Sequence, residues 1–386
     1  MGNPILLRGG HVFTEAGIFE EKNILIQDGK IHSLLLPEEN VQDVDVIDCS
    51  GKLITPGFID IHIHGRDGFD VVNAPAQVAG VLPKYGVTAF LPTTLTRSFE
   101  ETLHTLDRLS EYIDTQPTGC AQALGIYSEG MYFSREKAGA QNPEYLRDEV
   151  PIAELEQLIH AAKGHLKVIA FAPEKENAPA AAAWLKKQGI RSSMAHTNAL
   201  YPEVMACVEQ GLDGVTHTYD GMRGMTHIEL GAAGAATFTD SLWAELIADG
   251  YHVNPEFINI LFRFKPLDKI IFISDNVPPS GTPAGKCELG GLPVINEGDR
   301  LVLDTNNGVF SLAGSCLKLC DSIKNVHRFT GIPVEKLIPC ATVNPAKYIG
   351  VYETKGSIRE GKDADLNIFS QDLELCATYI HGNLYE

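Results

Sequence analysis

Residues 54–65, with the sequence ITPGFIDIHIHG, constrain the fold of this chain more than any other segment. A proline and a glycine break the preceding segment, and the short apolar run that follows predicts a buried strand. His62 and His64 close this run, and both imidazoles face one way because alternate side chains of a strand point to the same side. Two neutral imidazoles at a strand end suit a divalent metal, although ordinary hydrogen bonding explains an isolated pair equally well.

Predicted strands alternate with predicted helices between residues 54 and 355, and eight such strands can be counted. This order is typical of a (β/α)8 TIM barrel of the α/β class. Residues 278–312 interrupt the alternation with a segment that predicts an insertion containing a hairpin. We therefore expect the barrel to span residues 54–355.

The two ends of the chain differ from its middle in their pattern of apolar and turn residues. Residues 1–53 and 356–386 consist of short apolar stretches separated by turn residues, among them the pair Asp28 and Gly29, which is a hairpin signal. Since both ends are rich in predicted strands, we expect them to form one small β-sandwich domain together.

Metal-ligating side chains recur directly after the predicted barrel strands. Glu129 follows the third strand, His196 the fifth, His217 the sixth and Asp275 the eighth. The C-terminal ends of parallel barrel strands meet at one face, so these side chains and the first two histidines should converge. One such residue is weak evidence, but six buried polar groups in one place need a common partner, and a divalent cation supplies it.

A divalent cation at this face also gives a reason for the carboxylate of Asp275. Such a cation acidifies water and polarises a carbonyl group. A carboxylate within reach can accept the proton and return it to a leaving nitrogen. The residues therefore indicate metal-assisted hydrolysis of an amide.

The charge balance restricts the partners of the chain. The formal net charge is −19, from 31 basic and 50 acidic residues, which disfavours binding to nucleic acid or to an anionic membrane surface. We find neither an apolar run long enough for a membrane span nor a secretory signal. The eight cysteines form no CxxC pair, so we expect reduced thiols, a cytoplasmic location and a small-molecule substrate.

Nearly the whole chain resembles one known family, in an ordered set of motifs that is more specific than the histidine pair. PGFIDIHIHG is similar to the opening motif of the amidohydrolase superfamily. Further segments match motifs of the N-acetylglucosamine-6-phosphate deacetylase family: Glu129-Gly130-Met131-Tyr132, Ala138-Gly139-Ala140-Gln141-Asn142-Pro143, Ala195-His196-Thr197-Asn198-Ala199, Val215-Thr216-His217-Thr218-Tyr219-Asp220-Gly221-Met222, Ile247-Ala248-Asp249-Gly250-Tyr251-His252-Val253, Ser274-Asp275-Asn276, Leu312-Ala313-Gly314-Ser315 and Asn344-Pro345-Ala346.

The resemblance implies roles for the residues at the strand ends. Asp275 is the implied catalytic acid and base. Glu129 takes the bridging position, because no lysine follows the fourth predicted strand. The implied cofactor is one or two divalent ions of zinc, iron, manganese or cobalt. The implied metal ligands are Glu129, His196, His217, His62 and His64.

The resemblance also implies a pocket for an amino sugar and a homodimer in which a loop of the neighbouring subunit reaches the substrate. The implied substrate contacts are Ala140, Gln141, Asp220, Gly221, Arg223, His227, His252, Leu312, Ala313 and Gly314.

Three positions of the substrate loops depart from the pattern of the family: Gln141 for its histidine, Asp220-Gly221 for its Asn-Ala pair and Ile228 for its phosphate-binding arginine. An isoleucine offers a phosphate group no charge-assisted hydrogen bond. The carboxylate of Asp220 would repel a phosphate as well. Arg223 and His227 lie in the same loop and are the residues expected to compensate.

The leading hypothesis is a metal-dependent deacetylase that hydrolyses the N-acetyl amide of an amino-sugar 6-phosphate and gives acetate and the free amino sugar phosphate. One alternative is a deacetylase of an unphosphorylated or differently configured N-acyl amino sugar, for instance of the N-acetylgalactosamine type. A second alternative is a non-catalytic binding protein on the same barrel.

Overall fold

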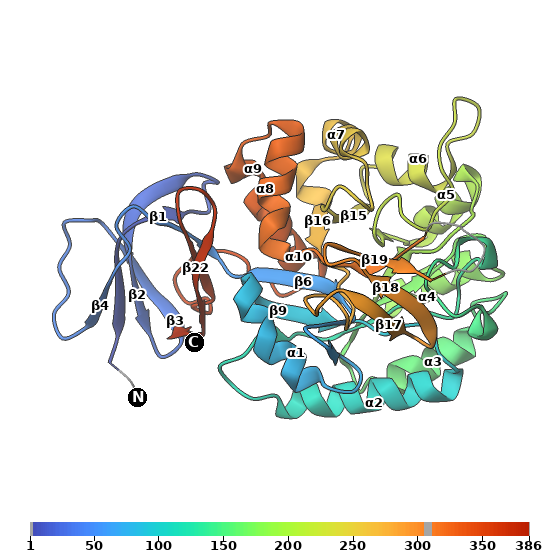
Figure 1. Ribbon diagram of the computed structural model, residues 1–386, viewed down its shortest axis with the longest axis horizontal. Helices are drawn as coiled ribbons and strands as arrows, with labels where there is room; N and C mark the ends of the chain where they lie inside the picture. The colour runs from blue at the N-terminus through green and yellow to red at the C-terminus, as the bar shows by residue number, and fades with distance from the viewer. Residues whose placement is uncertain (1–2, 305–310, 386) are drawn as a thin grey trace.

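The computed structural model describes residues 3–304 and 311–385. Figure 1 shows a small part, which holds strands from both ends of the chain, beside a larger part in which strands and helices alternate. β5 (Leu53–Pro56) of the small part leads into β6 (Phe58–Ile63) of the larger part across Gly57. A Cβ atom at Gly57 would lie 2.2 Å from Oγ1 of Thr88, so this passage requires a glycine.

One mixed sheet joins the first and last strands of the chain, in the order β23-β22-β21-β5-β1-β2-β3, with β4 beside β1. The predicted Asp28-Gly29 turn connects β2 and β3, with both residues at positive φ. The remaining strands of this sheet are β1 (Ile5–Phe13), β2 (Phe19–Gln27), β3 (Lys30–Leu35), β4 (Asp45–Asp48), β21 (Leu366–Phe369), β22 (Leu375–Ile380) and β23 (Asn383–Leu384).

The larger part is of the TIM-barrel type. Its parallel strands pair in two runs, β10-β9-β6 and β11-β12-β13-β14-β15-β16. A bridge between Thr93 and Tyr127 links the runs on one side, and a hydrogen bond from the backbone N of Asp275 to the carbonyl of His62 links them on the other. The strands after β6 are β9 (Val87–Pro92), β10 (Gln122–Ala123), β11 (Ile126–Ser128), β12 (Leu166–Phe171), β13 (Arg191–Met194), β14 (Gly214–Val215), β15 (Trp243–Ile247) and β16 (Ile270–Ile273).

The third predicted strand is divided in the structure. β10 pairs with β9 and β11 pairs with β12, so the chain changes neighbours between Ala123 and Ile126. Gly125 lies at this bend with φ +149, and a Cβ atom there would meet the side chain of Lys167 at 2.4 Å. A continuous strand was predicted because the sequence pattern reports burial and not the strand's neighbours.

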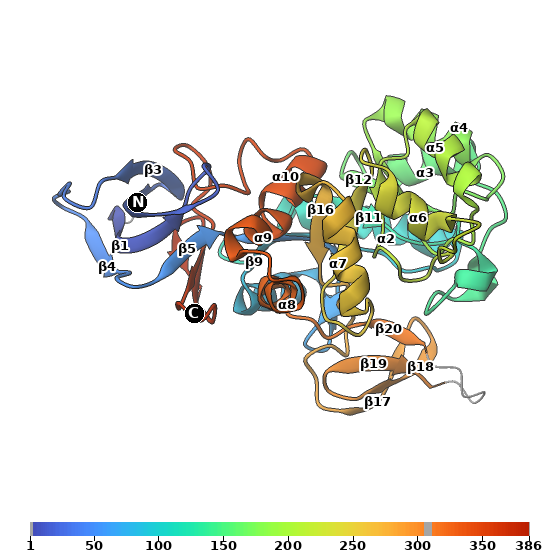
Figure 2. The same ribbon diagram turned by 90° about the horizontal axis from the view of Figure 1, so that it is seen from above.

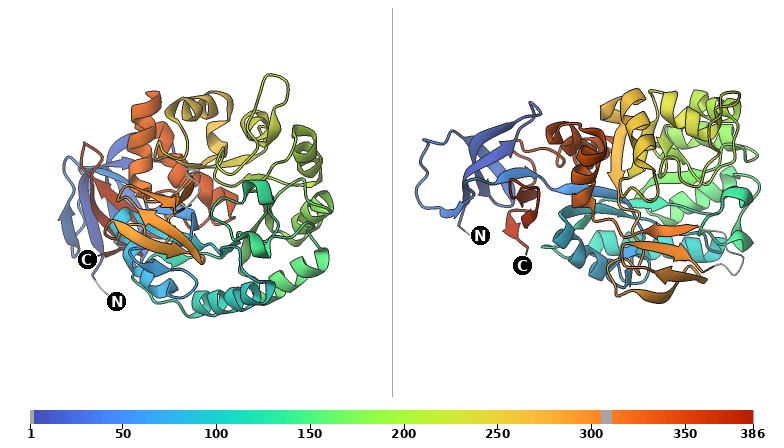
Figure 3. Two further views of the ribbon diagram at one scale, coloured as in Figure 1. Left: turned by 45° about the vertical axis from the view of Figure 1, so that its right-hand side comes forward. Right: turned by 45° about the horizontal axis from the view of Figure 1, so that its top comes forward.

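Helices lie around the strands of the larger part, as the left view of Figure 3 shows. Local signals set several boundaries: Ser98 and Glu101 form a capping box at the start of α2, and α4 ends at Gly189 in a left-handed conformation. The helices are α1 (Pro75–Val81), α2 (Phe99–Thr115), α3 (Ile152–Ala161), α4 (Ala178–Gln188), α5 (Tyr201–Gln210), α6 (Gly231–Phe238), α7 (Pro255–Phe264), α8 (Leu319–Thr330), α9 (Val334–Ala341) and α10 (Val343–Tyr348).

The predicted insertion is a four-stranded antiparallel sheet after β16, in the order β17-β18-β19-β20. Figure 2 shows it in orange on one side of the larger part. Its strands are β17 (Gly285–Leu289), β18 (Leu292–Asn296), β19 (Arg300–Leu303) and β20 (Leu312–Ser315). Leu289, Leu312 and Gly314 bring this sheet to the wall of the cavity described below.

None of the helices in the described ranges combines the length and the apolar character that crossing a membrane requires. All eight cysteines are free thiols, in agreement with the expectation drawn from their spacing.

Candidate active site and metal centre

A cavity of about 390 Å³ is lined by residues that follow the carboxyl ends of the parallel strands. Most of the predicted site residues line it: His64, Glu129, Ala140, Gln141, His196, His217, Asp220, Gly221, His252, Asp275, Leu312 and Gly314. His62 lies beneath this lining with a fully buried side chain. The other predicted contacts, Arg223, His227 and Ala313, do not belong to the lining.

The carboxylate of Glu129 lies between two pairs of histidines. Its Oε1 is 3.3 Å from Nε2 of His196 and 3.2 Å from Nε2 of His217. Its Oε2 is 3.3 Å from Nε2 of His64 and 3.7 Å from Nε2 of His62. One carboxylate therefore offers an oxygen to each side of the site, which is the arrangement of a bridging ligand.

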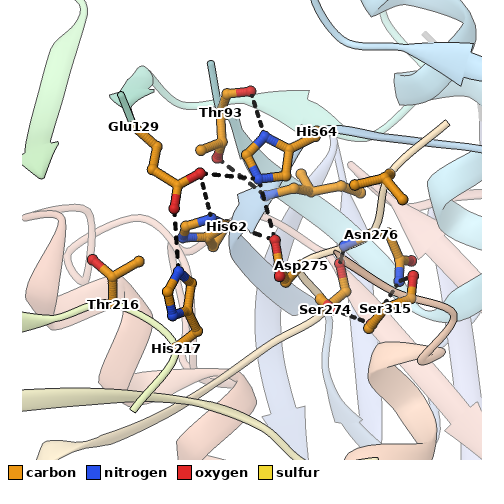
Figure 4. A network of polar contacts seen from close by, with 12 residues as sticks. His62, His64, Thr93, Glu129, Thr216, His217, Ser274, Asp275, Asn276 and Ser315 are labelled. Carbon is orange, nitrogen blue, oxygen red and sulfur yellow. Dashed lines mark hydrogen bonds and ion pairs between the residues drawn. The ribbon is translucent and has the colours of Figure 1, made fainter. Parts of the chain in front are cut away.

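Asp275 completes the pair formed by His62 and His64. Its Oδ1 lies 3.1 Å from Nε2 of His64 and 3.5 Å from Nε2 of His62, as Figure 4 shows. Two groups result, each with ligand atoms within 4.8 Å of one another: His62, His64 and Asp275 on one side, and Glu129, His196 and His217 on the other.

Each ligand histidine is oriented by a hydrogen bond at its second ring nitrogen. Nδ1 of His64, His196 and His217 meets a backbone carbonyl, at 3.1, 2.9 and 3.2 Å respectively. Nδ1 of His62 instead meets the carboxylate of Glu245 at 3.1 Å. With Nδ1 acting as the donor in each case, Nε2 faces the centre of the site, where it can offer its lone pair to a bound cation.

Strained backbone conformations coincide with three of these residues. His196, His217 and Asp275 have φ angles of 41°, 31° and 49°. Left-handed φ in residues other than glycine costs about 1–3 kcal/mol each and concentrates at functional sites. Each of the three follows a barrel strand, so the chain turns sharply there and directs the side chain over the strand ends.

The electrostatics of the site keep its carboxylates ionised. Burial would raise the pKa of Glu129, but His62, His196 and His217 hold that pKa well below its usual range. Burial likewise opposes the low pKa of Asp275, which hydrogen bonding to His64 and the neighbouring histidines maintain. Burial lowers the pKa of His217, yet the contacts with Glu129 raise it to about 9. The carboxylates thus favour positive charge at the centre.

The residues present fit a divalent cation. Nε2 of His62 is buried and has no hydrogen-bond partner among the described residues, although a polar nitrogen in such a place requires one. Imidazole nitrogens and carboxylate oxygens together suit zinc, iron, manganese or cobalt. Glu129, His196 and His217 could hold one ion, and His62, His64 and Asp275 a second.

Gln141 contributes a neutral amide at the position where the sequence resemblance led us to expect a histidine. Its Nε2 donates to Oε2 of Glu129 at 3.0 Å, and its Oε1 accepts from the backbone N of Thr96 at 2.9 Å. The amide is thus fixed at both ends, beside the bridging carboxylate. A neutral donor there adds no charge to the site.

His252 stands on the cavity wall after β15. Its Nδ1 lies 2.7 Å from Oδ2 of Asp249. Oδ1 of the same carboxylate accepts hydrogen bonds from the backbone N of Tyr251 and of His252. Burial lowers the pKa of His252, but the hydrogen bond and the charge of Asp249 raise it above its usual value. The ring is therefore held rigidly at a place where a substrate can contact it.

Residues 223–228, which were expected to supply the phosphate contacts, do not belong to the described lining of this cavity. Ile228 is 86% exposed. The guanidinium of Arg223 is engaged by Glu229 at 3.1 Å and by the side-chain oxygen of Asn198 at 3.1 Å. Neither residue supplies a cation to the described cavity wall, and His227 is exposed.

Among the residues of the site that sequence reasoning missed, three carry a charged group or an aromatic ring. Lys137 is the one lysine or arginine in the described lining of the cavity, and Tyr251 belongs to the same lining. Glu245 lies below His62 in the middle of β15. Only Glu245 left a signal in the sequence, as the single acidic residue of an otherwise apolar predicted strand.

Comparison with known proteins identifies the family. The model of the amidohydrolase family matches residues 53–384. The chain belongs to the amidohydrolase family. Enzymes of this family act on amides and are generally metal-dependent, so this amidohydrolase is an enzyme and the alternative of a non-catalytic binding protein is set aside.

Its relatives are deacetylases, and they confirm the resemblance seen in the sequence. N-acetylgalactosamine-6-phosphate deacetylase of Escherichia coli O157:H7 is 34% identical over 383 residues, 98% of either chain. N-acetylglucosamine-6-phosphate deacetylase of Vibrio furnissii is 34% identical over 345 residues, 88% of this chain and 84% of that one. The crystal structure of N-acetylglucosamine-6-phosphate deacetylase from Thermotoga maritima matches with a TM-score of 0.87 and 28% identity, covering 99% of both chains.

Proposed function

We propose that this amidohydrolase removes the acetyl group from an N-acetylated amino-sugar 6-phosphate, releasing acetate and the free amino sugar phosphate. The observation that carries the proposal is the carboxylate of Glu129, whose two oxygens each meet a histidine pair at the floor of a polar cavity. The relatives named above deacetylate amino-sugar 6-phosphates, which supports the same bond as the target here.

Two separate groups of side chains would each bind one metal ion. Glu129, His196 and His217 would hold one ion, and His62 and His64 with Asp275 provide room for a second. A bound divalent cation supplies Lewis acidity, which polarises the amide carbonyl and acidifies water at the site.

Asp275 is the proposed proton carrier. Its Oδ1 faces the histidine nitrogens, and its side chain borders the cavity, so it can contact both the site and a substrate. In the overall reaction the C–N bond of the amide breaks and a C–O bond forms. Asp275 accepts the proton that water loses and delivers it to the leaving nitrogen, so that the amine departs in a neutral form.

His252 and Gln141 would position the sugar. His252 is held at Nδ1 by Asp249, which leaves Nε2 for a hydroxyl group of the sugar or the acyl carbonyl. Gln141 stands beside Glu129 at the floor of the cavity. Both side chains are buried and fixed by hydrogen bonds, so little conformational entropy is lost when a substrate binds.

Lys137 is the proposed partner of the phosphate group. A phosphate requires charge-assisted donors, and Lys137 is the one lysine or arginine in the described cavity wall. The carboxylate of Asp220 also lines the cavity and disfavours an anion in its vicinity. We therefore place the phosphate toward Lys137 and the sugar hydroxyl groups toward Asp220.

The finer features of the architecture belong to the same proposal. We infer that the eight parallel strands close into a (β/α)8 barrel over residues 54–355. Residues 1–53 and 356–386 would then form a separate small β-domain. We also infer a homodimer, which sedimentation can test.

Acetate release from a panel of four substrates tests the function: N-acetylglucosamine and N-acetylgalactosamine, each with and without a 6-phosphate. The proposal expects the phosphorylated sugars to react much faster than the unphosphorylated ones. Faster turnover of the free sugars would favour the alternative of an unphosphorylated substrate. No acetate release from any of the four by fully metal-loaded protein would contradict the proposed function.

A further inference from the structure

One of the four ligand histidines is held differently from the others. His64, His196 and His217 each direct Nδ1 at a neutral backbone carbonyl. His62 directs Nδ1 at the carboxylate of Glu245, with 3.1 Å between Nδ1 and Oε2. The two ligand groups therefore differ in more than their members, because a buried carboxylate contacts the second ring nitrogen of a histidine in the group that contains His62.

Glu245 occupies a place where a charge is costly. It lies at the centre of β15, all of whose residues are buried, and its own exposed fraction is 2%. The imidazole of His62 is the hydrogen-bond partner of its side chain, and Oε1 has none among the described residues. Burying a carboxylate costs several kcal/mol unless it is paired, so an apolar residue would serve packing better.

The position of Glu245 also requires it to reach past a neighbouring strand. β15 pairs with β14 and β16, while β6, which carries His62, contacts β9 and β16. The side chain of Glu245 thus crosses the interior of the larger part to reach the ring. A contact of this kind depends on the assembled fold, and its geometry is specific to one imidazole.

We propose that Glu245 is a positioning residue for the second metal subsite, which consists of His62, His64 and Asp275. By accepting the proton of Nδ1, its carboxylate fixes the tautomer in which Nε2 of His62 carries the lone pair and faces Asp275 and Glu129. A carboxylate behind a ligand imidazole also increases the basicity of that imidazole, and therefore its affinity for a cation.

The proposal predicts a selective effect on metal binding. Loss of the Glu245 carboxylate weakens the subsite that contains His62. The subsite of Glu129, His196 and His217 retains its affinity, since backbone carbonyls orient its histidines. This inference rests on the proposed metal centre, and metal binding, rather than deacetylation, is its readout.

The test is a titration of the metal-depleted full-length protein with cobalt(II), followed by visible absorption and by electron paramagnetic resonance. We expect the wild type to bind two ions. Glu245→Gln keeps the shape of the side chain but removes its charge, and we expect its second ion to bind about 10–100-fold more weakly, with the first unchanged. The resonance of the coupled ion pair should appear only at correspondingly higher cobalt concentrations.

Asp249→Asn is the matched control. Asp249 also holds a histidine by a carboxylate, His252, but that histidine belongs to neither ligand group. We expect this variant to bind both cobalt ions with wild-type affinity. The proposal would be overturned if Glu245→Gln weakened the cobalt affinity of both sites equally, or if it left the affinity of the second site within about twofold of the wild-type value. It would also be overturned if the wild type bound only one ion.

A measurement on the wild type covers the case in which Glu245→Gln does not fold. The measurement is nuclear magnetic resonance of zinc-loaded protein labelled with ¹⁵N-histidine, in which the signal of His62 is the one lost in His62→Gln. We expect His62 to carry a proton on Nδ1, and we expect the signal of that proton to lie furthest downfield among the candidate ligand histidines. A protonated Nε2 would overturn the proposal. A wild type that binds two ions but releases no acetate would contradict the proposed function alone.

Discussion

His64 and Asp275 meet across the site at 3.1 Å between Nε2 and Oδ1, although they follow β6 and β16, the first and the last of the parallel strands in the chain. A hydrogen bond from the backbone N of His64 to the carbonyl of Asn276 fixes the two strand ends against each other. Asp275 therefore belongs to a group that could hold a metal ion and also borders the cavity in which we propose that the substrate reacts.

Asp275→Asn should abolish most of the deacetylase activity. Asparagine keeps the size of the side chain but cannot accept and return a proton, and loss of a general acid and base costs about 10²–10⁴-fold in rate. The measurement is kcat for acetate release, with metal content determined on the same sample. A rate equal to that of the wild type at equal metal content would contradict the assigned role.

Lys137→Ala should separate phosphorylated from unphosphorylated substrates. Hydrogen bonds to charged groups contribute about 1.5–3 kcal/mol, so KM for the 6-phosphate should rise by roughly 10–150-fold, while KM for the free sugar stays unchanged. The backbone carbonyl that orients His196 survives this substitution. Arg223→Ala is the control, because its guanidinium is engaged by Glu229 outside the cavity lining. If Arg223→Ala raised KM for the 6-phosphate and Lys137→Ala did not, phosphate binding would be assigned to Arg223.

Lys355 should be essential for the stability of the chain. Its side chain is 3% exposed, and its Nζ lies 2.8 Å from Asp363 and 2.6 Å from Asp365. Removing one partner of a buried ion pair costs about 3–5 kcal/mol, so Lys355→Met should lower the free energy of unfolding by that amount at neutral pH. Lys324→Met breaks an exposed pair with Glu374, which solvent screens, so this substitution should leave the free energy of unfolding nearly unchanged. Equal effects of the two substitutions would refute this difference.

The same cluster predicts how stability changes with pH. Burial opposes the low pKa of Asp363, which the charge of Lys355 maintains, so its stabilisation is present above about pH 4 and is lost as the pH falls through the folded value. Burial also opposes the raised pKa of Lys355, whose stabilisation is present below about pH 10 and is lost as the pH rises further. Thermal unfolding should be measured from pH 3 to 11. We expect Lys355→Met to lose less stability than the wild type at both the acid and the alkaline end of this range, and an unchanged pH dependence would argue against the ion pair.

Metal removal should affect both activity and stability. An ion that binds the folded chain at a hundred times its Kd stabilises it by about 2.7 kcal/mol, so chelation should lower Tm by several degrees and stop acetate release. Adding zinc or cobalt should restore both quantities. A chelated, metal-free sample with unchanged Tm and rate would exclude a metal-dependent site.

The candidate ligand residues could be predicted from the sequence because each lies at or just after the end of a predicted strand. His62, His196 and Asp275 come at the ends of such strands, and parallel strands bring their ends to one face. The type of fold followed from the same alternation. The hydrophobic pattern does not show which strands pair with each other. The division of the third predicted strand into β10 and β11 at Gly125 was therefore missed.

The substrate loops were harder to predict, because their side chains are fixed by contacts distant in sequence. Arg223 was expected to face a phosphate, but Glu229 and Asn198 hold its guanidinium away from the cavity lining. Lys137 was not singled out, since a lysine in an irregular loop leaves no periodic signal. Glu245 was passed over as part of a buried strand, although an acidic side chain there needs a partner, which is His62.

Anomalous X-ray diffraction from crystals of the zinc-loaded protein tests most directly whether the strand ends assemble a metal centre. The account predicts a zinc peak about 2.0–2.2 Å from an oxygen of Glu129 and from Nε2 of His196 and His217. A zinc peak elsewhere, or fully loaded crystals with no peak among these three side chains, would contradict it.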